Sequence, residues 1–477
     1  MEHLPVSVLE QYPPIDAAAV NALLEREIRA NSAKLVVLDD DPTGVQTVHD
    51  LSVYTDWSPE SIRSGFAEKA KAFYILTNSR GMTVPETTAA HREIGERVAQ
   101  VSAETGTPYL LLSRSDSTLR GHYPLETELL RQSAEAAGKT VDGEILCPFF
   151  RDGGRFTIGG VHYVRQGSEL VPAAETEFAR DKTFGYTHSR LPEYIEEKTG
   201  GAYPASGVTC IRLEDLRACR YDAVTAQLTA VSGFGKVCVD AVDDGDLKVF
   251  AVSLYRALAQ GKNFLFRTAA GLVKVLAGVS DRPLLTRREL IGPAAAGRGG
   301  IVVVGSHTQK TSDQLAELLQ LQGTVPIEFN SDLVLEGDAA LDAEVDRCVA
   351  AEEAAIRQGR TAVCYTRRKL LEVPGDTKES ALVRSVKISD GVQRLVGRLR
   401  EAPAFVVAKG GITSSDVGVK ALQVRRADVA GQIRPGIPVW RLGAESRFPG
   451  IPYVIFPGNV GEVSTLREAV EILTEPD

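Results

Sequence analysis

The sequence predicts an α/β fold with two α/β domains, each built on a mainly parallel sheet, and an active site in the cleft between them. Short apolar runs alternate with longer helical patterns along most of the chain, which is typical of parallel strands covered by helices on both faces. The chain has 477 residues, whereas one ordinary domain has roughly 100–200. A polar stretch rich in Ala and Gly interrupts the pattern at 280–300 and is the expected linker.

The N-terminal part of the chain is expected to form an arm followed by the first domain. The arm spans 1–33 and carries one predicted helix over 16–30. The first domain is predicted to span 34–279, with strand-like runs at 34–39, 51–55, 72–77, 109–113, 144–149, 207–213, 236–242 and 263–267. Helical patterns separate these runs at 85–102, 123–138 and 246–260. Residues 151–205 are rich in Gly, Pro, Thr and Tyr, so we expect loops that reach over a site.

The second domain is predicted to span 301–477. Its strand-like runs lie at 301–306, 361–366, 404–411, 437–443 and 453–459. In open α/β sheets, ligands bind beyond the carboxyl ends of the strands. The polar residues that follow each predicted strand are therefore the candidates for chemistry.

Composition excludes several kinds of partner. The net charge of −9 argues against a nucleic-acid partner, because binding a phosphate backbone needs a basic face. No apolar run approaches the ~20 residues that cross a bilayer, and the acidic N-terminus is unlike a signal peptide. We therefore expect a cytoplasmic protein with no membrane partner, and a homodimer stays open. The cysteines and histidines show no metal-ligand spacing, so no metal-ligating residue is predicted.

Acidic and basic side chains follow three strands of the first domain. The first strand ends in three carboxylates, at 39–41, which can orient hydroxyls, act as a general base or hold Mg²⁺. Arg80 follows a later strand, and 114–121 adds further arginines and an acid after the next one. Arginine binds carboxylates with two parallel hydrogen bonds, so the set favours a small polyhydroxy acid as ligand. The alternative is an acidic turn with surface ion pairs, worth at most ~1 kcal/mol.

Glycine-bearing turns follow three strands of the second domain, at 305–308, 410–413 and 458–461. Glycine lets backbone N–H groups approach a phosphate closely. A single turn of this kind would usually be only a capped strand–helix connection. Three of them in one domain favour a nucleotide.

Together these motifs resemble the four-carbon acid sugar kinase family, which includes threonate, erythronate and 3-oxo-tetronate kinases. The resemblance covers about 34–473 of the chain. The family's D-D-x-T-G, S-R, K-x-D-S-T-L-R-G and G-R-x-T are similar to 40–44, 79–80, 114–121 and 154–157, with Arg114 in place of lysine. Its G-S, G-G-x-T and G-N-x-G are similar to 305–306, 410–413 and 458–461.

The resemblance implies a sugar-acid-binding N-terminal domain and an ATP-binding C-terminal domain. It implies an ATP-dependent kinase that uses Mg²⁺ and phosphorylates a terminal hydroxyl of a small sugar acid. The implied substrate-binding residues are Asp40, Asp41, Arg80, Asp116, Arg120 and Arg155. The implied ATP-binding residues are Ser306, Gly410, Gly411, Ile412, Thr413 and Gly458. Arg80 and Arg120 would hold the carboxylate, and Asp40 or Asp41 would act on the attacking hydroxyl as the catalytic residue.

The chain departs from the family pattern at two points. Ile412 stands where the family has an acidic residue, and 182–190 replaces a segment rich in Asp, Pro and Met. A branched acid such as 3-oxo-isoapionate is therefore a further candidate substrate. Two alternatives come from other functional classes: a non-catalytic sensor of sugar acid and nucleotide, and a metal-dependent phosphosugar lyase or isomerase.

Overall fold

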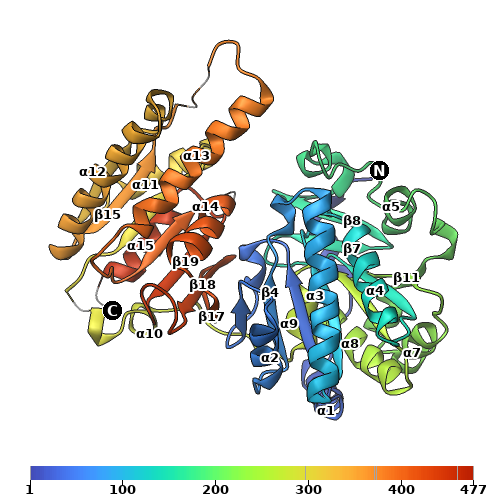
Figure 1. The fold of residues 1–477 in the computed structure, drawn as a ribbon. Coiled ribbons are helices and arrows are strands. Elements are labelled where there is room, and N and C mark those ends of the chain that lie inside the picture. Colours follow the sequence, from blue (N-terminus) through green and yellow to red (C-terminus); the bar gives the residue numbers. More distant parts are fainter. Residues whose placement is uncertain (1, 296, 370, 372, 459, 476–477) are drawn as a thin grey trace. The chain divides into compact units, whose positions relative to one another are not determined.

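The computed structural model describes residues 2–295, 297–369, 371, 373–458 and 460–475. The chain forms two compact units, one made of Met1–Gly44 and Asp56–Asp281 and the other of Val45–Thr55 and Arg282–Asp477. Each unit is α/β, as the sequence predicts (Figure 1). Within the described ranges, no helix has both the length and the apolar character that crossing a membrane requires.

The first unit is built on a parallel sheet with the strand order β10-β11-β6-β12-β5-β2-β4. The strands are β2 (Lys34–Asp39), β4 (Ala72–Leu76), β5 (Tyr109–Arg114), β6 (Gly143–Cys147), β10 (Thr209–Ile211), β11 (Gly235–Val239) and β12 (Phe264–Thr268). These strands are almost wholly buried, as expected for a parallel sheet covered on both faces.

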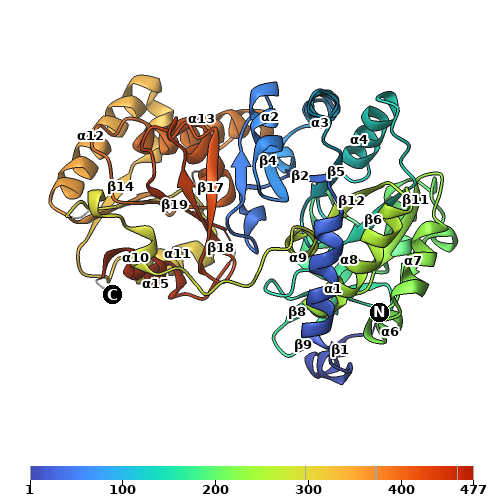
Figure 2. The ribbon, with the colours of Figure 1, turned by 90° about the horizontal axis from the view of Figure 1, so that it is seen from below.

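Helices cover both faces of this sheet (Figure 2). One face carries α2 (Pro59–Ala67), α3 (Val84–Thr105) and α4 (Leu125–Ala136). The other carries α1 (Ala17–Ala30), α7 (Tyr221–Thr229), α8 (Asp244–Ala259) and α9 (Ala270–Leu276). The predicted helix at 85–102 is α3, which begins with a capping box between Thr83 and Glu86 and ends at Gly106 in the left-handed conformation.

The segment 151–205 is not a set of loops, and that expectation was wrong. It forms an antiparallel sheet in the order β1-β9-β8-β7, followed by α5 (Leu191–Lys198). The strands are β1 (Leu4–Pro5), β7 (Arg155–Ile158), β8 (Val161–Gln166) and β9 (Glu169–Pro172). Gly159 and Gly160 both have positive φ, 60° and 80°, which suits the two-residue turn of a tight hairpin. The glycines that made the segment look irregular are thus the turns of a small sheet.

The second unit is built on a mixed sheet with the order β3-β17-β18-β19-β16-β13-β15-β14. Its strands are β3 (Ser52–Tyr54), β13 (Ile301–Val304), β14 (Thr324–Phe329), β15 (Thr361–Thr366), β16 (Val406–Lys409), β17 (Arg426–Arg434), β18 (Ile437–Leu442) and β19 (Pro452–Phe456). Neighbours from β19 to β14 are parallel, and the pairs from β3 to β19 are antiparallel. The run expected at 51–55 therefore forms as β3, but it pairs with β17 of this unit.

Helices again cover both faces (Figure 2). One face carries α12 (Asp338–Arg357) and α13 (Lys378–Gly397), with α14 (Gly411–Asp416) packed on α13. The other carries α10 (Arg287–Leu290), α11 (Gln309–Leu318) and α15 (Thr465–Thr474). The stretch 280–300 carries α10, and it contributes Leu285 and Leu290 to the core beside α15 and β13.

Candidate functional site

The carboxyl ends of β5, β2 and β4 meet at one edge of the first unit's sheet, because these strands are neighbours and parallel. Asp39, the last residue of β2, is in register with Leu76 of β4 and Arg114 of β5. Asp40, Arg80 and Ser115 follow these strand ends, and the side chains of Arg80 and Ser115 both contact that of Asp40. The structure thus brings together the acids and arginines that the sequence singles out.

Asp40 is buried and extensively hydrogen-bonded. Arg80 donates to it twice, from Nη2 to Oδ1 at 2.6 Å and from Nε to Oδ2 at 3.1 Å. Ser115 Oγ donates to Oδ2 at 2.5 Å. The side chain of Asp40 is only 2% exposed. Arg80 also donates to Asp41 Oδ2 at 3.3 Å, so its guanidinium is already paired with two carboxylates.

Asp41 is more open than Asp40, with its side chain 19% exposed. Its Oδ1 accepts hydrogen bonds from Thr43 N at 2.8 Å and Thr43 Oγ1 at 2.6 Å. Burial pushes the pKa of Asp41 upward, but Arg80 and the two Thr43 bonds outweigh it and hold the pKa below its usual value. Asp41 is therefore ionised near neutral pH, and from the described residues its Oδ2 accepts one long hydrogen bond, donated by Arg80.

Asp39 lies beneath these two carboxylates and is closed off. Arg114 Nη1 donates to its Oδ1 at 3.3 Å. A Cβ at Gly44 would lie 1.8 Å from Asp39 Oδ2, so only glycine fits at that position of the D-D-x-T-G motif. Burial raises the pKa of Asp39 to about 7. Asp39 has the basicity of a general base but no access to a ligand.

The second part of the site contains Asp116, Arg120 and Arg155. Arg120 Nε donates to Asp116 Oδ2 at 2.7 Å. The guanidinium groups of Arg120 and Arg155 both lie over the ring of Phe178, at 5.0 Å and 5.4 Å from its centroid. No ion pair joins the Arg155 guanidinium to a described acidic side chain, and its buried Nε has no hydrogen-bond partner among the described residues. The charges of Asp116 and Glu177 favour its protonated form from a longer distance, whereas burial lowers its pKa.

Two buried residues that sequence reasoning missed support these loops. His162 of β8 lies between Thr157 Oγ1, 3.0 Å from Nδ1, and Ser117 O, 2.8 Å from Nε2. Glu126 of α4 accepts hydrogen bonds from Ser79 Oγ at 2.6 Å and Ser113 Oγ at 3.1 Å. Each of these two residues connects segments that are distant in the sequence, so their contacts cannot be predicted from the sequence. The available signal was that each is an ionisable residue within an otherwise apolar pattern.

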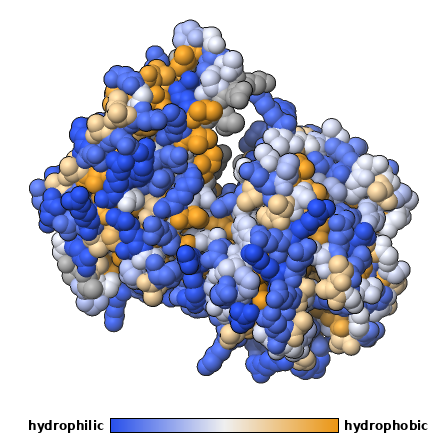
Figure 3. Space-filling view, viewed as in Figure 1, coloured by the Kyte–Doolittle hydropathy of each residue, from blue (hydrophilic) through white to orange (hydrophobic). Residues whose placement is uncertain are grey.

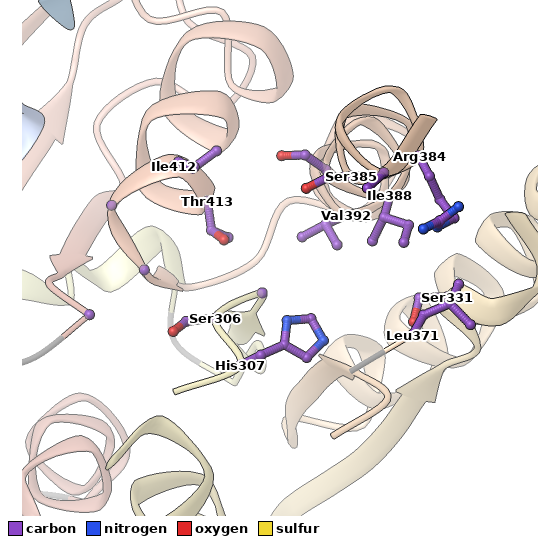
Figure 4. Close-up of a pocket in the computed structure, with 16 residues that line it drawn as sticks. Ser306, His307, Ser331, Leu371, Arg384, Ser385, Ile388, Val392, Ile412 and Thr413 are labelled. Atoms are coloured by element: carbon purple, nitrogen blue, oxygen red, sulfur yellow. The ribbon is translucent and has the colours of Figure 1, made fainter. Parts of the chain in front are cut away.

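In the second unit, a pocket of about 470 Å³ lies beyond the carboxyl ends of β13, β16 and β19 (Figure 4). It brings together all the residues expected to bind ATP, namely Ser306, Gly410, Gly411, Ile412, Thr413 and Gly458. Asn459, which belongs to the G-N-x-G motif, lies outside the described residues.

The glycines of this pocket are required by close packing. A Cβ at Gly305 would lie 2.3 Å from Thr413 Oγ1. Gly410 has a φ of 121°, and a Cβ there would lie 3.3 Å from the Ser306 side chain. Backbone from two strands can therefore approach a ligand at this point.

The opposite wall of the pocket comes from α13, which the sequence reading did not identify as a helix. Figure 4 shows Ile388 and Val392 of α13 facing the side of the pocket that carries Ser306, His307 and Thr413. Ile412 is 75% exposed, and Figure 3 shows further apolar residues among the hydrophilic surface of this unit. The one-turn spacing of 388 and 392 was the available signal. An apolar wall opposite polar turns suits a flat base attached to phosphates.

Comparisons with known proteins assign different ligands to the two parts of the chain. A sugar-binding N-terminal domain family matches residues 35–276, and a nucleotide-binding C-terminal domain family matches residues 301–466. The Haemophilus influenzae protein HI1011, of the DUF1537 family, is 18% identical with a TM-score of 0.61, covering 92% of this chain and 100% of that one. A Salmonella typhimurium LT2 protein, described as a candidate tRNA synthase, is 17% identical with a TM-score of 0.65, covering 91% of this chain and 98% of that one. At these identities the two structures support the fold alone. No curated protein matches the chain.

Proposed function

The chain belongs to the four-carbon acid sugar kinase family, and from this premise we propose that it transfers the γ-phosphoryl group of ATP to a terminal hydroxyl of a four-carbon acid sugar. Threonate, erythronate, 3-oxo-tetronate and the branched 3-oxo-isoapionate are the candidate acceptors. The observation that carries the proposal is the presence, in one chain, of an acid–arginine site in the sugar-binding domain and a glycine-lined pocket in the nucleotide-binding domain.

We assign the substrate carboxylate to Arg155, with Arg120 beside it. Arg155 forms no ion pair or Nε hydrogen bond with a described residue, and a bound carboxylate would accept hydrogen bonds from it directly. Arg120 donates to Asp116 through Nε, and its Nη1 lies 4.0 Å from Asp181 Oδ2. Because a guanidinium has five N–H donors, it would still have donors for the ligand. The expectation for Arg80 changes accordingly: it is held by Asp40 and Asp41, so its role would be to fix Asp41.

We assign the attacking hydroxyl to Asp41. This carboxylate is ionised, more exposed than Asp40, and held in one orientation by Thr43 and Arg80. The substrate oxygen would form a bond to the γ-phosphorus while the bond between that phosphorus and the β–γ bridging oxygen breaks, which releases ADP. The hydroxyl proton would pass to Asp41 Oδ2, from which it returns to solvent.

The nucleotide would be bound by the pocket of the second unit. The base would lie against Ile388 and Val392 of α13, and the phosphates would meet the backbone at Gly410, Gly411 and Gly458. The described residues include no group of three or more side chains that could hold a metal ion. Mg²⁺ usually keeps several waters and is held largely by substrate phosphates. The site would therefore suit a Mg²⁺ ion that arrives bound to ATP and neutralises part of the charge of its phosphates.

The proposal is tested by incubating the full chain with ATP, Mg²⁺ and single four- or five-carbon sugar acids, and weighing the products by mass spectrometry. We expect ADP and a phosphorylated acid in equal amounts with at least one acid. Binding of both ligands without a product would instead favour the sensor. Conversion of a phosphosugar without consumption of ATP would favour the lyase or isomerase.

A further inference from the structure

The loop that follows β19 is anchored mainly through its carbonyl oxygens, and Glu462 N also donates to Thr465 Oγ1 at 2.8 Å. Lys409 Nζ donates to Pro457 O at 2.7 Å and to Gly458 O at 3.0 Å. Gln314 Nε2 donates to Val460 O at 3.1 Å and to Glu462 O at 2.8 Å. The remaining described carbonyl of the loop, Gly461 O, accepts a hydrogen bond from Lys310 Nζ at 3.3 Å.

This anchoring fixes the direction of the loop's N–H groups. Because the peptide unit is planar and trans, the N–H of each residue points opposite to the C=O of the residue before it. The carbonyls of Pro457 and Val460 point toward Lys409 and Gln314, so the N–H groups of Gly458 and Gly461 point away from them. Neither N–H has an acceptor among the described residues. Gly458 lines the pocket, so at least one of these donors is at the candidate nucleotide site.

The two anchoring side chains are fully buried, and burying an ammonium or an amide group costs free energy. Lys409 and Gln314 are both 0% exposed. Burial, together with the smaller effect of the nearby charge of Lys310, lowers the pKa of Lys409 to about 7. An anion beyond the loop would offset this cost by favouring the protonated form.

A buried lysine that holds backbone carbonyls can also be purely structural, and the chain contains such a residue. Lys34, at the start of β2, donates to Glu68 O and Ala70 O, both at 2.6 Å, and is 8% exposed. It lies at the amino end of its strand, away from the strand ends where ligands bind. Lys409 likewise donates to two backbone carbonyls, but it lies at the carboxyl end of β16, beside Gly410 and Gly458 of the pocket.

We propose that Lys409 and Gln314 are positioning residues for the phosphates of the nucleotide. They serve this role by holding residues 457–458 and 460–462 so that the N–H groups of Gly458 and Gly461 face the anion. This inference rests on the proposed function, because the anion is the polyphosphate of ATP. It adds residues that touch neither substrate nor cofactor, and it gives the pocket its phosphate-binding end.

The test compares Lys409→Met with Lys34→Met in the full chain. Both variants remove one buried ammonium and two carbonyl contacts, but only the first acts on the loop. Dissociation constants are measured by calorimetry for ATP, ADP and adenosine. We expect Lys409→Met to weaken ATP and ADP by about tenfold or more and adenosine by less than about twofold, as for loss of a phosphate contact. Lys34→Met should bind all three like the wild type.

Further variants and outcomes keep the inference open to contradiction. Gln314→Leu removes the second anchor at similar volume, and it replaces Lys409→Met in the comparison if that variant does not fold. Lys409→Gln keeps donors without the charge and should recover part of the ATP affinity. A folded Lys409→Met or Gln314→Leu chain that binds ATP like the wild type overturns this inference alone. A wild-type chain that binds no ATP overturns the proposed function and this inference with it.

Discussion

At the scale of single residues, three consecutive carboxylates occupy three different environments. Asp39 is packed against Gly44, Asp40 accepts three hydrogen bonds from Arg80 and Ser115, and Asp41 is partly exposed. Adjacent residues at a strand end cannot present their side chains in the same direction, which is why their roles separate. Identical residue types therefore have different functions here because of their surroundings.

The first prediction concerns Asp41. Asp41→Asn keeps the shape of the side chain and a hydrogen bond from Thr43 but removes the charge and the basicity. We expect kcat to fall by about 10²-fold, the scale of a lost general base, with little change in the affinity for ATP or in the melting temperature. Steady-state kinetics with saturating acid and a thermal melt check this.

Asp40→Asn is the control for Asp41→Asn. It leaves the buried Arg80 without its main partner, so the free energy of unfolding should fall by about 3 kcal/mol. Asp39→Asn should affect kcat much less than Asp41→Asn. If Asp41→Asn turns over at the wild-type rate, the base must be another residue, and Asp116 would be examined first.

The second prediction concerns Arg155. Arg155→Met keeps the side-chain contact with Phe178 but removes the unpaired charge. We expect the KM for the acid to rise about 10- to 100-fold, the scale of a charge-assisted hydrogen bond, while the KM for ATP stays unchanged. Arg165→Met, on the adjacent strand β8 and exposed, is the matched control. An equal rise of both KM values, or of neither, would contradict a carboxylate-binding role.

Much of the residue-level site could be predicted because its residues sit in ordered motifs at strand ends. Asp40, Arg80 and Asp116 lie at the sheet edge as expected, and Ser306 and Gly410 line one pocket. The pairing of charges could not be predicted, since it depends on which side chains the fold brings within reach. The saturation of Arg80 and the missing partner of Arg155 are properties of the packed structure alone.

At the scale of elements, the β7–β8 hairpin carries Arg155 and is joined to the 114–121 segment through a buried side chain, that of His162. His162 connects Thr157 of β7 with Ser117 O. Asp240, after β11, accepts hydrogen bonds from the N–H groups of Gly159 and Gly160 at the tip of the hairpin, at 3.1 Å and 2.8 Å. Both contacts lie at the turn end of the hairpin, where Thr157 is paired with His162 and stands two residues after Arg155 on β7. The position of Arg155 therefore depends on how this end of the hairpin is held.

The third prediction concerns His162. His162→Phe leaves Ser117 O and Thr157 Oγ1 without this partner in a buried place, so unfolding should become easier by about 2–4 kcal/mol. The KM for the acid should rise more than kcat falls, because the hairpin carries Arg155. Urea denaturation and steady-state kinetics measure the two effects, and a variant with wild-type KM would argue against this coupling.

His162 also predicts a dependence of stability on pH. Burial lowers its pKa to about 4, below the ordinary value of 6.5. The unfolded chain therefore binds more protons between these values, and the stability present above pH 6.5 is lost as the pH falls toward 4. The loss should be about 3 kcal/mol in the wild type, and His162→Phe should lack it. Identical acid titrations of the two proteins would contradict the assignment.

Elements with continuous apolar runs were predicted well, and those without were not. The strand at 34–39 agrees with β2, and 361–366 agrees with β15. β14 was missed because Pro326 interrupts a short run at the sheet edge, and β17 because polar residues alternate with apolar ones over Arg426–Arg434. The α13 wall of the pocket was missed for a related reason, since its apolar stripe is short within a polar segment.

At the scale of the whole molecule, the second unit is not continuous in sequence. Residues 45–55 belong to it, and β3 pairs antiparallel with β17. Hydrogen bonds from Asp50 N to Val429 O, from Val429 N to Leu51 O and from Thr55 N to Arg425 O complete this edge. The sequence suggested two successive domains because 51–55 has the same apolar character as its neighbours. The apolar pattern of a short strand does not show which sheet it joins, because that depends on which neighbouring strand has free backbone groups to pair with.

The last prediction follows from this insertion and concerns fragments of the chain. A fragment of residues 282–477 lacks β3 and exposes the edge of β17. A second fragment would join residues 45–55 to residue 282 through about twenty Gly and Ser residues, a linker that spans about 25 Å on average. This length allows for the extended chain from Asp50 to Thr55, roughly 17 Å, beyond the ion pair in which the side chains of Asp50 and Arg282 lie 3.7 Å apart. We expect the second fragment to be more stable by about 2–4 kcal/mol, from several restored hydrogen bonds, and to bind ATP more tightly than the first.

Urea denaturation and calorimetry measure both quantities, and a matched fragment with Val53→Pro, which disrupts pairing with β17, should behave like the first. Equal stability and equal ATP binding by all three fragments would show that the inserted strand has no part in building the nucleotide-binding unit.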